Sequence, residues 1–287
     1  ARRTSDPPPP GSEGHVVFVL AEGAAYGLNA ASGEILWRLP VGFSTNGRNP
    51  AFPPTPMADK AGSDAVMVDA ERHEVLRVEA ATGRPRWRHP LGEPFDAHPV
   101  VADDRLLVAT RSGRLVSIGL DSGNSTSYIQ LPQELRIGPT VDFRRSSMYQ
   151  VAEHSNLFVL SLEDGKATQI VYLGHAPGTV TVSPVIVNRY LIVVENDGVE
   201  HATLHVLALE AEEEGQPSVH LVQNVKIKGH VDAPPQVYGV RMLVASDQGE
   251  LDVFEISATD AENPLARVAQ GKAARADEAA DPAATEG

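Results

Sequence analysis

The sequence predicts an all-β protein, a β-propeller built from four-stranded antiparallel blades. Turn tripeptides ending in glycine recur with spacings of 50, 40, 42 and 50 residues, at Gly33, Gly83, Gly123, Gly165 and Gly215. Prolines that open apolar runs recur in a similar rhythm, at Pro56, Pro99, Pro139, Pro184 and Pro235. No window of the chain has a sustained 3.6-residue apolar period, so a stack of helices is not expected.

One unit, residues 99–131, shows how each blade is expected to form. Four apolar runs follow one another, at 99–102, 105–110, 115–120 and 126–131. Each run is short, rich in β-branched or aromatic residues, and closed by Asp, Ser or Gly. Connections this short cannot make parallel crossovers, so the four strands form an antiparallel meander.

The repeats give five complete units and a first unit, beginning at His15, that lacks its first strand. We therefore expect about six visible blades in a ring of six to eight. The missing strand is expected upstream of Ala1 or from elsewhere in the ring. Residues 1–14 contain Pro7 to Pro10 and are predicted to be a proline-rich linker. Residues 258–287 are predicted to be an acidic, alanine-rich disordered tail, which leaves residues 15–257 as the propeller.

Composition restricts the function classes. The 287 residues include 24 Lys+Arg and 38 Asp+Glu, a net charge of −14, which argues against a general nucleic-acid binder. The chain has no cysteine, so disulfides, cysteine–metal centres and cysteine nucleophiles are excluded. No uninterrupted apolar run reaches the length of about 18 residues that a transmembrane helix needs.

Two units share a more specific motif. Gly27-Leu-Asn-Ala-Ala-Ser-Gly33 is followed by Glu-Ile-Leu-Trp37, and Arg77-Val-Glu-Ala-Ala-Thr-Gly83 by Arg-Pro-Arg-Trp87. In both, glycine and tryptophan stand four residues apart. Gly33 and Gly83 are expected to end tight turns between the third and fourth strands. Trp37 and Trp87 are expected to pack between adjacent blades and to donate their indole N–H to a neighbouring backbone.

The motif resembles the pyrroloquinoline-quinone-type propeller repeat. The likeness is strong in two units, and over the rest of residues 15–257 it consists of the repeat spacing. Some members of that family are quinone-dependent dehydrogenases, and others are non-catalytic scaffolds, such as the outer-membrane-assembly (BamB-like) propellers. The dehydrogenases are longer and resemble one another in a vicinal cysteine pair, so the resemblance implies the non-catalytic kind, in the periplasm or cell envelope. We expect no cofactor and no catalytic residue, and we expect a protein partner. A quinone-dependent dehydrogenase fragment stays open as the alternative.

Loops that precede the first strands carry a second set of candidates. They are expected to form an axial funnel with five side chains, Asp96, His98, His175, His230 and Asp232. Such a set could bind a metal ion or polar ligand, or serve a hydrolase or lyase. The other interpretation is that these side chains cap turns and fix loops. His201 and His205 lie about 13 Å apart on one strand, too far for one metal ion. Arg144 and Arg145 are interpreted as a small, solvated basic spot.

Overall fold

The computed structural model describes residues 15–42, 52–57, 64–69, 71–211, 217–257 and 259–273. The chain divides into two compact units, residues 1–131 and 132–287, and each is described by itself. The described residues form strands and turns only. Accordingly, that part of the chain contains no helix of the length and hydropathy needed to cross a membrane.

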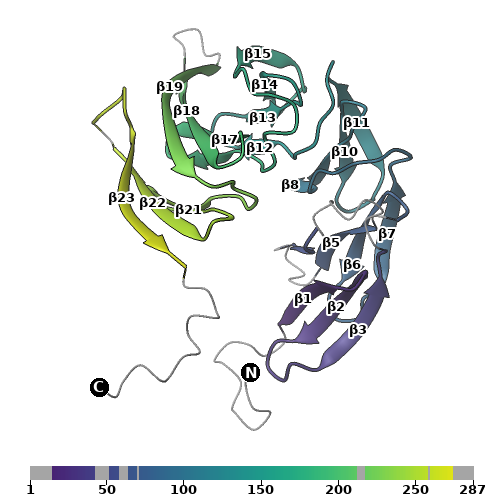
Figure 1. Cartoon of the computed structure of the whole chain (residues 1–287). Helices are drawn as coiled ribbons and strands as arrows, with labels where there is room; N and C mark the ends of the chain where they lie inside the picture. Colours follow the sequence, from purple (N-terminus) through teal and green to yellow (C-terminus); the bar gives the residue numbers. More distant parts are fainter. Residues whose placement is uncertain are drawn as a thin grey trace, which may run out of the picture. The chain divides into compact units, whose positions relative to one another are not determined.

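The first unit contains three antiparallel sheets, which we number as blades one to three (Figure 1). Blade one has three strands, β1 (Val16–Ala21), β2 (Ala24–Asn29) and β3 (Ile35–Pro40). Blade two has four, β4 (Thr55–Pro56), β5 (Asp64–Asp69), β6 (Glu74–Glu79) and β7 (Pro85–Pro90). Blade three also has four, β8 (Val100–Ala102), β9 (Arg105–Ala109), β10 (Arg114–Gly119) and β11 (Ser125–Gln130).

The second unit contains blades four to six, each a four-stranded antiparallel meander. Blade four comprises β12 (Thr140–Asp142), β13 (Ser147–Val151), β14 (Asn156–Ser161) and β15 (Ala167–Tyr172). Blade five comprises β16 (Val185–Val187), β17 (Tyr190–Asp197), β18 (His201–Ala211) and β19 (Pro217–Lys228). Blade six comprises β20 (Gln236–Tyr238), β21 (Arg241–Ala245), β22 (Glu250–Ile256) and β23 (Leu265–Lys272). The predicted propeller fold of four-stranded antiparallel blades is confirmed, and the described part of the first blade has three strands.

Turn chemistry sets the strand boundaries. In blade three, Asp103, Gly113 and Gly123 stand in the three turns with φ of 59°, 83° and 68°. Positive φ is easy for glycine and tolerated by aspartate, so these residues end the strands where the sequence predicts. The glycines of the other described third-to-fourth-strand turns behave alike, with φ of 76° at Gly33 and 71° at Gly165. Gly215 and the linker at 1–14 lie outside the described residues.

The last blade extends beyond the boundary expected from composition. β23 pairs with β22 from Leu265 to Lys272, inside the segment 258–287 that the sequence assigns to a tail. Leu265 is buried in the core, and Arg267 Nε lies 3.1 Å from Asp252 Oδ1. The strand therefore forms because the edge of β22 and a buried leucine fix it, although its own composition is not β-rich. Residues 274–287 lie outside the described residues.

Each blade carries one irregularity at the same place. The pairing between its outermost strand and the strand next to it shifts by one residue, for example between Arg77 and Val78 on β6 and between Val159 and Leu160 on β14. A bulge increases the local twist and re-aims the side chains around it. One residue of the outermost strand pairs with the last residue of the neighbouring strand before this shift. We call the place of that outermost-strand residue the docking position. Its occupants are Trp37, Trp87, Ser127, Gln169, Gln223 and Ala269.

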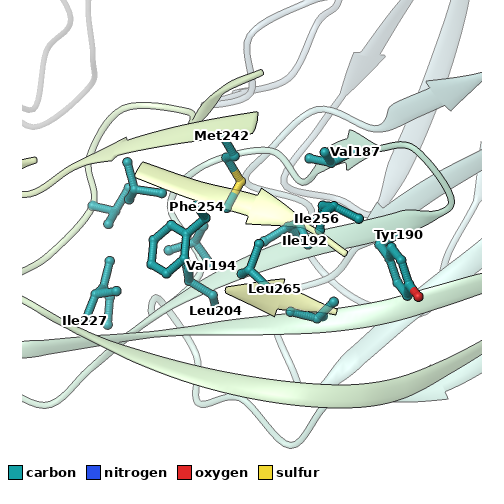
Figure 2. Close-up of a cluster of buried hydrophobic side chains, with 14 of the residues drawn as sticks. Val187, Tyr190, Ile192, Val194, Leu204, Ile227, Met242, Phe254, Ile256 and Leu265 are labelled. Carbon is teal, nitrogen blue, oxygen red and sulfur yellow. The ribbon is translucent and has the colours of Figure 1, made fainter. Parts of the chain in front are cut away.

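The cores lie between neighbouring blades of each unit. In the first unit, Trp37 packs with Met67, Leu76 and Val78 across blades one and two. In the second unit, the cluster drawn in Figure 2 joins Ile192, Val194 and Leu204 of blade five to Met242 and Phe254 of blade six. Both faces of an inner blade are thus apolar and covered, as a stack of sheets requires.

Candidate functional site

Asp96 and His98, two of the five predicted funnel residues, are in the first unit, in the loop that leads into β8. Asp96 Oδ2 lies 2.6 Å from Arg111 Nε and 2.5 Å from Arg111 Nη2, so a guanidinium holds its carboxylate. The His98 ring lies within hydrogen-bond distance of the carbonyl oxygens of Pro99 (2.8 Å) and Pro53 (3.1 Å). Both side chains therefore fix the loop locally.

The other three predicted funnel residues are in the second unit. His175 is buried, and its Nδ1 lies 3.1 Å from the carbonyl oxygen of Ala176. The His230 ring lies 2.9 Å from the carbonyl oxygen of Gly198, and its backbone N–H donates to Asp247 Oδ1. Asp232 is exposed. Among the described side chains of this unit, no hydrogen bond or ion pair joins His175, His230 and Asp232 to one another.

One backbone contact explains why these loops have fixed positions. In blades three to six, an N–H at or just after the end of the second strand donates to a carbonyl of the loop entering the same blade. The pairs are Arg111 to Pro94, Glu153 to Glu134, Asn196 to Thr179 and Asp247 to His230, at 2.8–3.2 Å. The five predicted funnel residues lie in loops that these backbone hydrogen bonds hold in place. Within the described residues, no group of three or more His, Asp or Glu side chains is placed to hold a metal ion.

The two tryptophans make a more elaborate contact. Trp37 Nε1–H donates to the carbonyl of Ala80 in blade two, and the exposed fraction of Trp37 is 8%. A Cβ atom built on Gly83 would lie 2.6 Å from the Trp37 ring, and one on Gly27 would lie 2.3 Å from it. The indole therefore fills a slot between a glycine of its own blade and a glycine of the next.

Blades two and three repeat this arrangement. Trp87 Nε1–H donates to the carbonyl of Leu120 at 2.7 Å, and a Cβ atom on Gly123 would lie 2.6 Å from the ring. His89 Nδ1 lies 2.8 Å from the carbonyl oxygen of Gly123. In both pairs the accepting carbonyl belongs to the residue three before the turn glycine.

Glutamine replaces tryptophan at the docking position of blades four and five. The Gln169 side-chain amide donates to the carbonyl of Val219 and accepts from its N–H, both at 2.8 Å. Gln223 makes the same pair of bonds to Leu265, at 3.0 and 2.8 Å. Each amide thus binds the outer strand of the following blade. Sequence reasoning missed these contacts because it followed the tryptophan alone.

A polar cluster on blade five was also missed. His205 is buried, with Nε2 at 2.8 Å from Glu195 Oε2 and Nδ1 at 2.8 Å from Asn224 Oδ1. Thr179 Oγ1 lies 3.3 Å from the other oxygen of Glu195. The three residues Glu195, His205 and Asn224 come from adjacent strands, and their distant sequence positions gave no signal.

The outer edges of the blades differ in chemistry. β7 carries Arg86 and Arg88, which pair with carboxylates of their own blade, and β19 ends in Lys226 and Lys228. In contrast, β11 and β15 have no charged residue. Among the described strands, β15 pairs with β14 alone, so its other edge is the end of that sheet. On β15, Ile170 and Tyr172 are 59% and 77% exposed.

Such an edge is unusual. Exposed edge strands in natural proteins are commonly protected from strand addition by charged side chains. No described strand pairs with the outer edge of β15, and two large apolar side chains lie on one face of this strand. It therefore has the features of a surface that accepts another strand.

Comparisons with known proteins agree with this architecture. Residues 71–213 match the family model described as outer membrane protein assembly factor BamB. BamB from Moraxella catarrhalis is 19% identical, with a TM-score of 0.65 over 85% of this chain and 70% of that one. Hsv2 from Kluyvelomyces marxianus is 11% identical, with a TM-score of 0.63 over 91% and 83%. A protein of unknown function from Desulfotomaculum acetoxidans DSM 771 is 12% identical, with a TM-score of 0.66 over 89% and 79%. No curated protein sequence matches the chain.

The strand order and the repeated bulges define the class of this protein, a β-propeller module. Over residues 71–213 its repeats match those of the pyrroloquinoline-quinone-type, BamB-like kind, in agreement with the tryptophan motif.

Proposed function

We propose that the chain is a non-catalytic binding module of the cell envelope that takes a strand or sheet edge of a partner protein along β15. The observation that carries this proposal is the uncharged open edge of β15 with its exposed Ile170 and Tyr172. The matching family supports the compartment, since it is described as an outer membrane protein assembly factor.

Strand addition explains what each part of β15 contributes. The free edge supplies N–H and C=O groups that an incoming extended chain can pair with. Ile170 and Tyr172, two residues apart, lie on one face of the strand and would pack on side chains of the incoming strand. Because the chain has a net charge of −14, a basic partner would associate faster, and added salt would slow that association.

A capture experiment with matched variants tests the proposal. The tagged chain is incubated with a lysate of the cells that produce it, and captured proteins are quantified by mass spectrometry. Ile170→Lys places a charge on the β15 edge, and Ile35→Lys makes the same change on β3, at a residue that is 63% exposed. We expect a stoichiometric protein that wild type and Ile35→Lys retain and that Ile170→Lys reduces at least tenfold.

Two results would contradict the proposal. Equal capture by all three forms, each verified as folded by circular dichroism, would remove β15 from the interface. A bound quinone, metal ion or other small ligand in native mass spectra, without a protein partner, would favour the enzymatic alternative.

A further inference from the structure

A hollow of about 540 Å³ lies in the second unit, away from the β15 edge strand. It is formed where the turns between the first and second strands of blades four, five and six come together. Phe143 and Arg144 line it from the β12–β13 turn, Asn188 from the β16–β17 turn, and Gly239 and Val240 from the β20–β21 turn. Its volume is in the range of pockets that hold small ligands or a few side chains.

The walls of the hollow present apolar side chains to solvent. Phe143 is 57% exposed and Val240 is 46% exposed, each on the turn of its own blade. Exposed apolar groups gathered at a concave surface are a mark of a binding site, because covering them removes apolar area from water.

One cation in the hollow is not neutralised within the described structure. Arg145 pairs with Asp142, with Nη1 at 2.7 Å from Oδ2. The other oxygen of Asp142 accepts the backbone N–H groups of Arg144 and Arg145 at 3.0 and 3.3 Å. The buried Asp142 carboxylate is therefore committed to its own turn. The exposed Arg144 guanidinium forms no ion pair with a described residue.

We propose that this hollow binds an acidic, apolar segment of another protein, with a side-chain carboxylate on Arg144 and an aromatic or branched side chain against Phe143 and Val240. Charge complementarity selects this occupant, because an exposed arginine that has no ion pair with a described residue is a local exception on a chain of net charge −14 and attracts a carboxylate. A guanidinium can bind that carboxylate through two hydrogen bonds. The concave shape favours inserted side chains over a lipid surface. This site differs from β15 in place and in chemistry, so it goes beyond the function proposed above.

Fluorescence anisotropy with defined peptides tests the proposal. The probe is a fluorescein-labelled peptide pool in which Glu alternates with randomised Phe, Leu, Tyr or Val, with an amidated C-terminus. A second pool has Gln in place of Glu. The whole chain is titrated at about 0.15 M salt, where long-range repulsion is screened beyond roughly 8 Å. We expect the Glu pool to bind at least tenfold more tightly than the Gln pool.

Variants locate the binding. Arg144→Gln should weaken binding of the Glu pool about tenfold, and Arg144→Lys should weaken it less. Phe143→Ser should weaken it at least threefold. Arg84→Gln is the matched control, since it removes the same charge from an exposed arginine in the first unit and should change nothing.

Equal binding of the Glu and Gln pools would overturn the proposal. Unchanged binding of the Glu pool by folded Arg144→Gln would overturn it as well. Tight binding of a Gln pool with a free C-terminus would assign Arg144 to chain termini instead. Arg144-dependent binding of phosphatidylglycerol vesicles, with no binding of the Glu pool, would assign the hollow to a lipid surface.

Discussion

Replacing Gly83 by alanine tests the tryptophan contact between blades one and two more sharply than deleting the tryptophan does. Gly83 has a φ of 68°, and a Cβ atom there would lie 2.6 Å from the Trp37 ring. Gly33 stands at the same place in its own turn, with a φ of 76°, but a Cβ atom there would meet nothing within 4 Å. The two glycines therefore share the backbone cost of alanine and differ in the steric cost.

The magnitudes follow from these contacts. An L-residue at left-handed φ costs about 1–2 kcal/mol, so Gly33→Ala should lower the free energy of unfolding by that amount. Gly83→Ala adds a clash, because carbon atoms prefer about 3.5–4.0 Å, and such overpacking costs about 1–3 kcal/mol. Gly83→Ala should therefore cost about 2–5 kcal/mol. Trp37→Ala removes a buried aromatic side chain and should cost about 3–5 kcal/mol.

The assay is urea unfolding followed by far-ultraviolet circular dichroism at about 15 °C, near the usual temperature of maximum stability. In the Trp37→Ala background the clash disappears, so Gly83→Ala should cost no more than Gly33→Ala does alone. The expected coupling between Trp37 and Gly83 is about 1–3 kcal/mol. Equal costs for the two glycine substitutions in the wild-type background, or full additivity with Trp37→Ala, would refute the docking role of Trp37.

Two further predictions concern single residues. Burial of Tyr149 raises its pKa to about 12 from the ordinary 10, so the folded state retains a proton that the unfolded chain loses, and the free energy of unfolding should fall by about 2 kcal/mol as pH rises from 10 to 12. Urea unfolding at several pH values should show a smaller decline in Tyr149→Phe, and an unchanged decline would contradict the assignment. Asp96→Ala removes the partner of Arg111 and should lower the melting temperature by several degrees, whereas a catalytic Asp96 would lose turnover with stability intact.

The sequence predicts the strands of this fold well where turn residues mark their ends. Residues 99–131 show this, because Asp103, Gly113 and Gly123 all take positive φ and close β8, β9 and β10. The prediction fails at β23, where Ala266, Gln270 and Gly271 give no β signal. Pairing with β22 and the Gln223 contact to Leu265 specify that strand, and neither can be found from local composition.

The candidate site was harder to predict for a related reason. Asp96 and His98 were correctly located in a loop before a first strand, but their partners Arg111 and Pro53 come from other segments. Likewise, His205 was considered with His201 because both stand on one strand. Its actual neighbours, Glu195 and Asn224, lie on the adjacent strands. Spacing along one chain segment gives periodicity, whereas side-chain partners depend on the register between strands.

The central claim, that β15 is where a partner protein binds, is tested most directly by photo-crosslinking in the cells that produce the protein. A photoreactive amino acid replaces Tyr172 on β15 or, as a control, Val199 in the β17–β18 turn. These side chains are 77% and 87% exposed, so the control is at least as accessible. We expect one discrete protein adduct from position 172 and none from position 199. The same adducts from both positions, or no protein adduct from position 172, would contradict the claim.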